Sequence, residues 1–133
     1  GLVFVSSSFD KPVLKAIRLA GATGDVTESH VAWTLQKGVP HTPSMLLSGD
    51  SLFCVSDGGI ATCLDARTGT PVAGFGENGR VDLTQGLRRS FPRADYTNQA
   101  PPLVVGDVVV VGSSKNAMPT ITVPTAPIPP HTA

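Results

Sequence analysis

Short hydrophobic runs, each ended by glycine, aspartate or serine, recur along most of the chain. In SMLLSGDSLFCVSDGGIATCLD, residues 44–65, three such runs follow one another with only brief polar segments between them. Runs of this length separated by Gly-Asp and Asp-Gly pairs are typical of antiparallel strands joined by tight turns. The pattern therefore predicts strands at 43–48, 51–56 and 59–64.

The two polar segments in this stretch predict the register of the hairpins. Gly49-Asp50 has glycine first, which suits a two-residue type II′ turn, and Asp57-Gly58 suits a two-residue type I′ turn. The second turn would place Cys54 opposite Ala61 and put Cys54 and Cys63 diagonally on one face. Diagonal neighbours are about 7–8 Å apart, which is too far for a disulfide. We therefore expect two reduced cysteines in the core.

Neither face of the predicted three-stranded sheet is polar. With these turns, one face holds Leu52, Cys54, Ala61 and Cys63, and the other holds Phe53, Val55, Ile60, Thr62 and Leu64. An antiparallel sheet with one face in water would alternate apolar and polar residues. The sequence therefore predicts that this sheet lies between two others.

The same hairpin occurs three times. The segment 100–114, APPLVVGDVVVVGSS, follows the pattern of 44–57, and LVFVSSS at 2–8 matches the strand around Phe53. Phe4, Phe53 and Val110 occupy the same position in the three copies, at spacings of 49 and 57 residues. A strand-forming repeat of about this length is typical of β-propeller blades, each a four-stranded antiparallel sheet. Trp33, in the segment HVAWTLQ, is predicted to pack in an outer strand.

This repeat divides the chain into three partial blades and a tail. Residues 1–36 supply the second to fourth strands of a blade (2–7, 12–18, 30–36), residues 42–84 supply all four (the last at 80–84), and residues 98–112 supply the first two (100–105, 108–112). Residues 115–133 contain many prolines, which exclude a central strand, so we predict polyproline-type or disordered chain there.

Composition excludes several classes of function. The chain has 10 basic and 10 acidic residues without a basic stripe, so we expect no nucleic-acid partner. It has no long apolar run that could span a membrane, so we expect no membrane partner. Its first residues form a strand-like run without a basic region, which is not the pattern of a signal peptide.

Three segments resemble a known family. VFVSSSFDKPVLKAIR and residues 30–69 are similar to exported, non-enzymatic repeats of pyrroloquinoline-quinone (PQQ) type. PVAGFGENGRVDL, at 71–83, and APPLVVGDVVVVGSS resemble quinoprotein dehydrogenases, with their Thr-Gly-x-Pro and Phe-Gly-x-x-Gly connection. The resemblance covers residues 2–114 and implies an all-β propeller fold. It also implies relatives that are often periplasmic or exported, although the compartment of this chain cannot be read from its sequence.

The resemblance does not extend to the catalytic residues of quinoprotein dehydrogenases. That family uses two adjacent cysteines, a stacking tryptophan and carboxylates that hold calcium. Here the two cysteines are nine positions apart inside predicted strands, and Ala73 stands near the place of the usual docking tryptophan. We therefore expect no PQQ site and no cofactor-binding residues in this chain.

Three partial blades cannot close a propeller, which needs about four to eight blades. Open blade faces would expose apolar surface and unpaired edges to water. We therefore expect homo-oligomerisation, as a dimer or trimer, to complete the blades. In this hypothesis the strands at 100–112 of one copy pair with those at 12–18 and 30–36 of another, which gives a hybrid blade.

Antiparallel connectivity places the loops at two ends of the blades, and one end contains candidate catalytic and metal-binding residues. The loops at 8–11, 39–41, 57–59 and 88–98 are predicted to share this end. His41 and Asp57 could then bind a divalent metal, zinc or manganese, with Asp57 as the catalytic carboxylate of a hydrolase. The alternative is structural, with His41 capping a loop and Asp57 serving its turn.

The segment RRSFPRADY provides a second candidate. Arg88, Arg89, Arg93 and Tyr96 could hold a small anionic ligand such as a phosphate or sulfate ester. A solvated loop is the alternative interpretation.

These features leave three functions open. The first is an oligomeric binding or assembly module of quinoprotein type without redox activity. The second is a metal-assisted hydrolase of phosphate or sulfate esters with its site at the oligomer channel. The third is a residual PQQ-dependent dehydrogenase.

Overall fold

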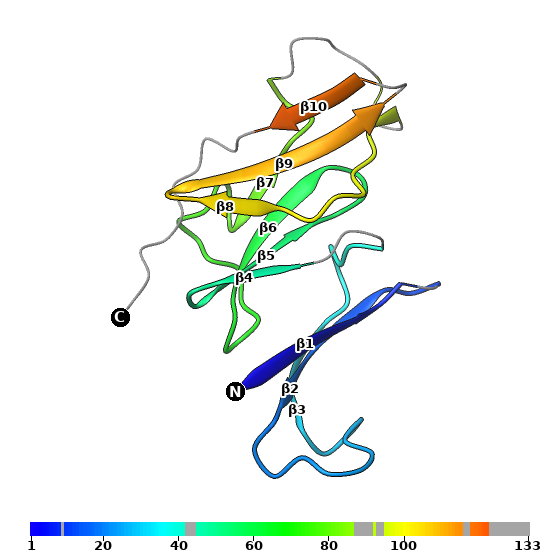
Figure 1. Ribbon diagram of the computed structural model, residues 1–133, viewed down its shortest axis with the longest axis vertical. Coiled ribbons are helices and arrows are strands. Elements are labelled where there is room, and N and C mark those ends of the chain that lie inside the picture. The colour runs from blue at the N-terminus through cyan, green and yellow to red at the C-terminus, as the bar shows by residue number, and fades with distance from the viewer. Residues whose placement is uncertain (9, 42–44, 87–91, 93–94, 116–117, 123–133) are drawn as a thin grey trace.

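The computed structural model describes residues 1–8, 10–41, 45–86, 92, 95–115 and 118–122, and these form ten strands in three antiparallel sheets (Figure 1). The first sheet has the order β1-β2-β3, the second β4-β5-β6-β7 and the third β8-β9-β10. The strands are β1 Leu2–Ser7, β2 Val13–Arg18, β3 Val31–Leu35, β4 Leu46–Ser48, β5 Ser51–Val55, β6 Ile60–Asp65, β7 Arg80–Asp82, β8 Leu103–Val105, β9 Val108–Lys115 and β10 Met118–Thr122. The predicted all-β architecture of sequential antiparallel sheets is confirmed.

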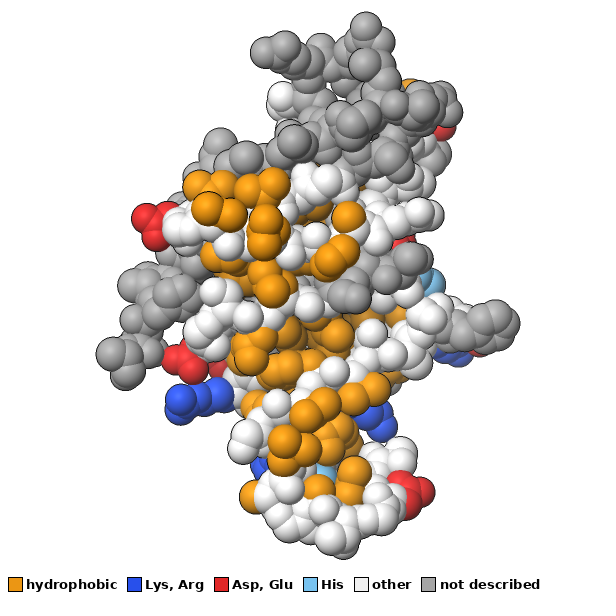
Figure 2. Space-filling view, in the orientation of Figure 1, with side chains coloured by type: hydrophobic (Ala, Val, Ile, Leu, Met, Phe, Trp, Pro, Cys, Tyr) orange, Lys and Arg blue, Asp and Glu red, His pale blue; other side chains and the backbone are white. Residues whose placement is uncertain are grey.

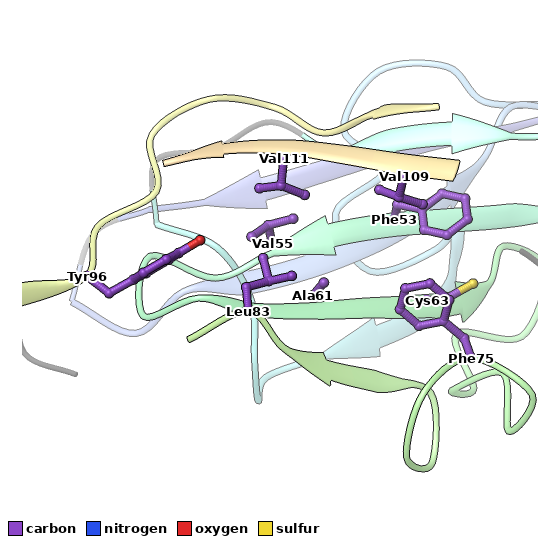
Figure 3. Close-up of a cluster of buried hydrophobic side chains, with 9 residues drawn as sticks. All are labelled: Phe53, Val55, Ala61, Cys63, Phe75, Leu83, Tyr96, Val109 and Val111. Carbon is purple, nitrogen blue, oxygen red and sulfur yellow. The ribbon is translucent and has the colours of Figure 1, made fainter. Parts of the chain in front are cut away.

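The four-stranded sheet is the middle layer, and both of its faces are buried (Figure 1). Every residue of β5 is at most 6% exposed. On one face, Leu52, Cys54 and Leu64 pack with Leu14 of β2. On the other face, the hydrophobic cluster reaches Val109 and Val111 of β9. Its members are Phe53, Val55, Ala61, Cys63, Phe75, Leu83, Tyr96, Val109 and Val111 (Figure 3). The prediction that this sheet lies between two others is confirmed.

The Gly49-Asp50 and Gly106-Asp107 turns have the predicted form. Both connect strands through two residues, since Ser48 pairs with Ser51 and Val105 with Val108. Gly49 has φ 58° and Gly106 has φ 57°, as the first position of a type II′ turn requires.

The turn at 56–59 differs from the prediction by one residue. Gly59 N donates to Ser56 O, and Gly59 has φ 84°. This is a three-residue loop that ends in a left-handed glycine bulge, not a two-residue turn. Val55 therefore pairs with Ala61, and Phe53 pairs with Cys63.

This shift moves the two cysteines to opposite faces of the middle sheet. Cys54 lies in the cluster shared with the first sheet, whereas Cys63 lies in the cluster shared with the third. The prediction of a common face was wrong, because a shift of one residue turns every side chain of a strand over. Both cysteines are free and buried, as expected.

The C-terminal part of the chain contains more strand than expected. β9 continues to Lys115, and β10 pairs along it at Met118–Thr122, where composition predicted irregular chain. β10 is an edge strand, and an edge tolerates proline because its outer N–H groups need no partner. The expectation for 115–133 is therefore wrong over 118–122, and residues 123–133 lie outside the described residues.

β10 also changes the expected assembly. The hybrid blade required β9 of one copy to pair with β2 of another. However, β9 is already paired on both edges, by β8 and β10, and β2 is paired on both edges by β1 and β3. A hybrid blade of this kind would therefore require an existing strand pair to open.

Trp33 joins the first sheet to the middle sheet, in agreement with the predicted packing role. Its indole Nε1 donates to Ala66 O at 3.0 Å, and its ring lies 5.8 Å from that of Phe4. A Cβ on Gly69 would lie 2.6 Å from Trp33 Cδ2. The ring therefore sits directly on the backbone of the turn that follows β6.

Candidate functional site

Loops from all three sheets meet at one end of the middle sheet, as the loop sorting predicted. The Ser56–Gly59 turn lies at the centre of this group. His41 approaches it from the connection between the first two sheets, and Tyr96 and Asn98 approach it from the connection to the third. Ser8, which follows β1, also reaches the group, through a contact with His41. We call these five loop positions the junction: Ser8, His41, Asp57, Tyr96 and Asn98.

Within the junction, the structure brings His41 and Asp57 together through the backbone of His41. His41 N donates to Asp57 Oδ2 at 3.1 Å. The imidazole Nδ1 contacts Ser8 O at 3.2 Å, so this nitrogen is directed at a backbone carbonyl. Such a contact fixes the orientation of the ring and leaves Nε2 to face other partners. Asp57 therefore anchors the loop that carries His41. This is a structural role, the alternative to metal binding for these two residues.

A metal site at His41 and Asp57 stays a prediction. Protein zinc sites use three or four side-chain ligands. Over the described residues, no three His, Cys, Asp or Glu side chains are grouped closely enough to hold an ion. The described part of the chain therefore offers no third ligand to join His41 and Asp57. The predicted catalytic role of Asp57 also stays a prediction.

Tyr96 lies in the core and not on a ligand-binding surface. Its side chain is 4% exposed and belongs to the cluster with Leu83 and Val111 (Figure 3). A Cβ on Gly59 would lie 2.5 Å from Tyr96 Cε1, so the ring needs a glycine at this turn. The structure does not support the predicted anion-binding role of Tyr96. Arg88, Arg89 and Arg93 lie outside the described residues, and their predicted role stays a prediction.

Asn98 is a junction residue that sequence reasoning missed. It is fully buried, its N donates to Asp57 O at 3.2 Å, and its Oδ1 accepts from Ala100 N at 3.2 Å. Its Nδ2 has no hydrogen-bond partner among the described residues. The signal that could have located it is Asn two positions before Ala-Pro-Pro, because asparagine closes such turns with its own side chain.

Neither cysteine is suited to nucleophilic or metal chemistry. Burial, with a smaller contribution from Cys63, raises the pKa of Cys54 to about 12. Burial also raises the pKa of Cys63, against an opposing hydrogen bond from Ser51. Because the thiolate is the reactive form, both thiols remain protonated and inert near neutral pH.

The opposite end of the middle sheet is ordered by Asp65. Its Oδ1 accepts from Arg67 N at 2.9 Å, Thr68 N at 2.9 Å and Thr68 Oγ1 at 3.1 Å. These bonds hold the turn on which Trp33 rests. Hydrogen bonds to the charged form, with that from Thr68 N first, lower the pKa of Asp65.

We expect Asp65→Ala to lower the free energy of unfolding by about 1–2 kcal/mol at pH 7, because the turn loses the carboxylate that accepts from Arg67 N, Thr68 N and Thr68 Oγ1. The lowered pKa sets the pH dependence. The contribution of ionised Asp65 to the free energy of unfolding is fully present when the pH is above 3.8, the ordinary pKa of an aspartate. It is lost as the pH falls through the lower pKa that Asp65 has in the folded state. Urea unfolding at pH 7 and pH 3 measures both effects, and the difference between variant and parent should shrink at pH 3. Asp25→Ala is the matched control, because Asp25 Oδ1 accepts from Thr27 N and Thr27 Oγ1 in an exposed turn, and it should change stability less. A difference that stays the same at both pH values would contradict the role of the ionised carboxylate.

The fold and the junction define a class of protein, that of β-propeller repeats whose blades pack face to face. Residues 23–128 match the family described as "Glucose/ethanol/alcohol dehydrogenase, beta-propeller domain", of PQQ type. This match covers well over half of the chain, and the chain belongs to this family. The resemblance inferred from the sequence is therefore confirmed.

Individual proteins are also similar to this chain, and the solved structures among them show a likeness of fold. A "Probable quinate dehydrogenase (quinone)" of Xanthomonas campestris pv. juglandis is 42% identical over 64 residues, which are 48% of this chain and 8% of that protein. A quinohemoprotein alcohol dehydrogenase from Comamonas testosteroni has a TM-score of 0.57 at 20% identity, over 86% of this chain and 16% of that one. A europium-containing methanol dehydrogenase has a TM-score of 0.53 at 21% identity, over 86% of this chain and 19% of that one. The chain thus spans less than a fifth of the length of these proteins.

The described residues do not form a binding site for PQQ. This cofactor is a flat quinone with three carboxylates, so it needs an open aromatic face and several cations or a bound metal. The ring of Trp33 packs against Gly69 and Phe4, and the ring of Tyr96 lies in the core. Cys54 and Cys63 lie on opposite faces of one sheet, and so cannot form an adjacent pair. The described part of the chain also contains no helix that could cross a membrane.

Proposed function

We propose that the chain acts as an assembly module of the PQQ-type propeller family, in an oligomer and without a redox centre of its own. The observation that carries this proposal is that each outer sheet exposes aliphatic side chains on the face turned away from the middle sheet. The exposed aliphatic residues on these sheets are Val3, Val5, Leu103 and Val105, at 41–59% exposure. Sheets in a propeller are stable when both faces are covered, so the module functions by stacking with further blades.

We expect the full chain, mixed with PQQ and calcium, to show no dye-linked oxidation of quinate or primary alcohols. The physical reason is that the rings of Phe53, Phe75 and Tyr96 are packed in the core, and that the described residues contain no group of three His, Cys, Asp or Glu side chains that could hold a metal ion. The measurement is reduction of an artificial electron acceptor, together with quenching of the single tryptophan by added PQQ. A purified quinoprotein dehydrogenase treated identically is the positive control. Stoichiometric PQQ binding with substrate-dependent dye reduction would overturn the absence of redox activity.

A second candidate function is a share in a complete PQQ-dependent dehydrogenase that acts on a cyclic hydroxy acid. It is favoured by the 42% identity over 64 residues with the probable quinate dehydrogenase. In this case the remaining blades would supply the cofactor site, and this chain would supply neighbouring walls of the ring. Dye reduction that appears only when the chain is combined with further blades of such an enzyme would support this candidate over the first.

The hydrolase alternative needs metal ligands beyond His41 and Asp57. Ester cleavage that appears on adding zinc or manganese, and disappears in His41→Ala, would support it.

A further inference from the structure

The two buried interfaces between the sheets of this chain have the same arrangement, in which each sheet packs on the next through equivalent positions of the repeat. We call the face of a sheet that packs on the preceding sheet its leading face, and the opposite one its trailing face. Leu52 and Cys54 form the leading face of the middle sheet, and both are 1% exposed. Val109 and Val111, which follow by 57 residues, form the leading face of the third sheet and are at most 2% exposed. Each interface is therefore a trailing face covered by the next leading face.

The first sheet has a leading face that is not covered within this chain. Val3 and Val5 precede Leu52 and Cys54 by 49 residues and occupy the same positions of the repeat. They are 41% and 53% exposed. Val3 pairs with Ile17, which extends the same apolar face onto β2. The trailing face of this sheet is covered as this arrangement requires, because Leu14 and Ala16 are fully buried.

The third sheet has the complementary feature, an uncovered trailing face. Leu103 and Val105 are each 59% exposed. They pair with Val110 and Val108, so these four side chains lie on one face of β8 and β9. The corresponding positions of the middle sheet, 57 residues earlier, include Ser48 and Ser51 where the third sheet has Val105 and Val108. This open face is therefore more apolar than its buried counterpart. Hydrophobic side chains reach the surface over all three sheets in Figure 2.

We propose that the open trailing face of β8–β9 docks on the open leading face of β1–β2 of a second copy of this chain. The occupant is a second copy because each chain carries both halves of an interface that it already forms twice internally. This inference rests on the proposed assembly function and names its surface and orientation. The contact is head-to-tail, so two identical contacts close a ring when the rotation allows it. Two copies supply six sheets, within the range of about four to eight blades in closed propellers.

Among the described residues of β1 and β2, Lys15 is the one charged residue on the open leading face. It pairs with Val5, at the repeat position where the middle sheet has the buried Thr62. Its aliphatic stem can cover the face while the ammonium group stays in water. Docking of a second sheet takes the ammonium group out of water at a cost in free energy, so Lys15 weakens the contact. The contact should therefore become tighter when Lys15 is replaced by the residue of the middle sheet.

The test uses the full chain and light scattering coupled to size-exclusion chromatography over a range of concentrations. We expect a discrete mass of two copies. Leu103→Asp and Val5→Asp each place a carboxylate in one half of the contact, and each should weaken association about a hundredfold or more. Leu47→Asp is the matched control, since Leu47 is 49% exposed but lies on the middle sheet. Lys15→Thr should tighten association about fivefold.

The outcomes separate this inference from the function on which it rests. Loss of association in both face variants, with the control unchanged and circular dichroism preserved in all, supports the proposed contact. Association that survives both face substitutions overturns the contact and leaves the assembly function standing. A single-copy mass for the unsubstituted chain at all concentrations overturns both, and assigns the open faces to blades of another polypeptide.

Discussion

Replacing Phe53 by alanine is expected to lower the free energy of unfolding by about 3–5 kcal/mol. Phe53 is 2% exposed and lies in the cluster that joins the middle and third sheets (Figure 3). Its ring packs edge-on against Phe75, with centroids 5.8 Å apart. Alanine removes the ring from both sheets and leaves a cavity that the flanking strands, held by their ladders, cannot close. Domains are stable by only about 5–15 kcal/mol, so this loss removes a large part of the total.

The measurement is urea unfolding followed by circular dichroism at one fixed protein concentration, because association would contribute to apparent stability. Phe53→Leu retains most of the apolar volume and should lose about 1–1.5 kcal/mol. Leu47→Ala, at a half-exposed position of the neighbouring strand, is the control and should change little. Equal losses for Phe53→Ala and Leu47→Ala would contradict the view that the core lies between the sheets.

Much of the fold follows from the sequence because the strands around Phe53 have apolar residues on both of their faces. That pattern required a sheet covered on both sides, and the repeated Gly-Asp turn located its neighbours. The register of β6 could not be predicted, because Ser-Asp-Gly-Gly suits both a two-residue turn and a three-residue turn with a glycine bulge. The structure has the three-residue form, in which Tyr96, which lies far along the chain, packs on Gly59. Likewise, proline content indicated an irregular tail, whereas an edge position allows β10 to contain Pro119.

The sequence predicted the position of the candidate site more accurately than the chemical roles of its residues. Antiparallel connectivity was sufficient to bring His41 and Asp57 to one end of the sheets. It could not show that Asp57 binds the backbone of His41 and not its ring, because that depends on the path of a single loop. Nor could it show that Tyr96 points inward, since an aromatic residue in a polar segment is equally suited to a surface. The residue types of a loop thus indicate where side chains gather but not which atoms they present.

Replacing Gly69 by alanine is expected to destabilise the chain through Trp33, by an amount that backbone strain alone does not explain. Gly69 has φ 73°, and a Cβ there would lie 2.6 Å from Trp33 Cδ2. The indole must then move, although its Nε1 is bonded to Ala66 O. We expect the free energy of unfolding to fall by about 2–4 kcal/mol, because alanine is strained in the left-handed conformation and the displaced indole loses packing contacts. Gly38→Ala is the matched control, because Gly38 has the same φ of 73° and no atom within 4 Å of the added Cβ.

A double-mutant cycle separates the two terms. Trp33→Ala alone should cost about 2–4 kcal/mol, since it removes a half-buried ring that joins two sheets together with its hydrogen bond. In that background the Cβ of Gly69→Ala no longer meets the indole, and its cost should fall to that of Gly38→Ala, about 1 kcal/mol. The two substitutions are therefore expected to be less damaging together than the sum of their separate effects. Strict additivity would mean that the indole does not rest on this turn. The first and middle sheets would then be joined by the remaining cluster around Leu14 and Leu52 alone.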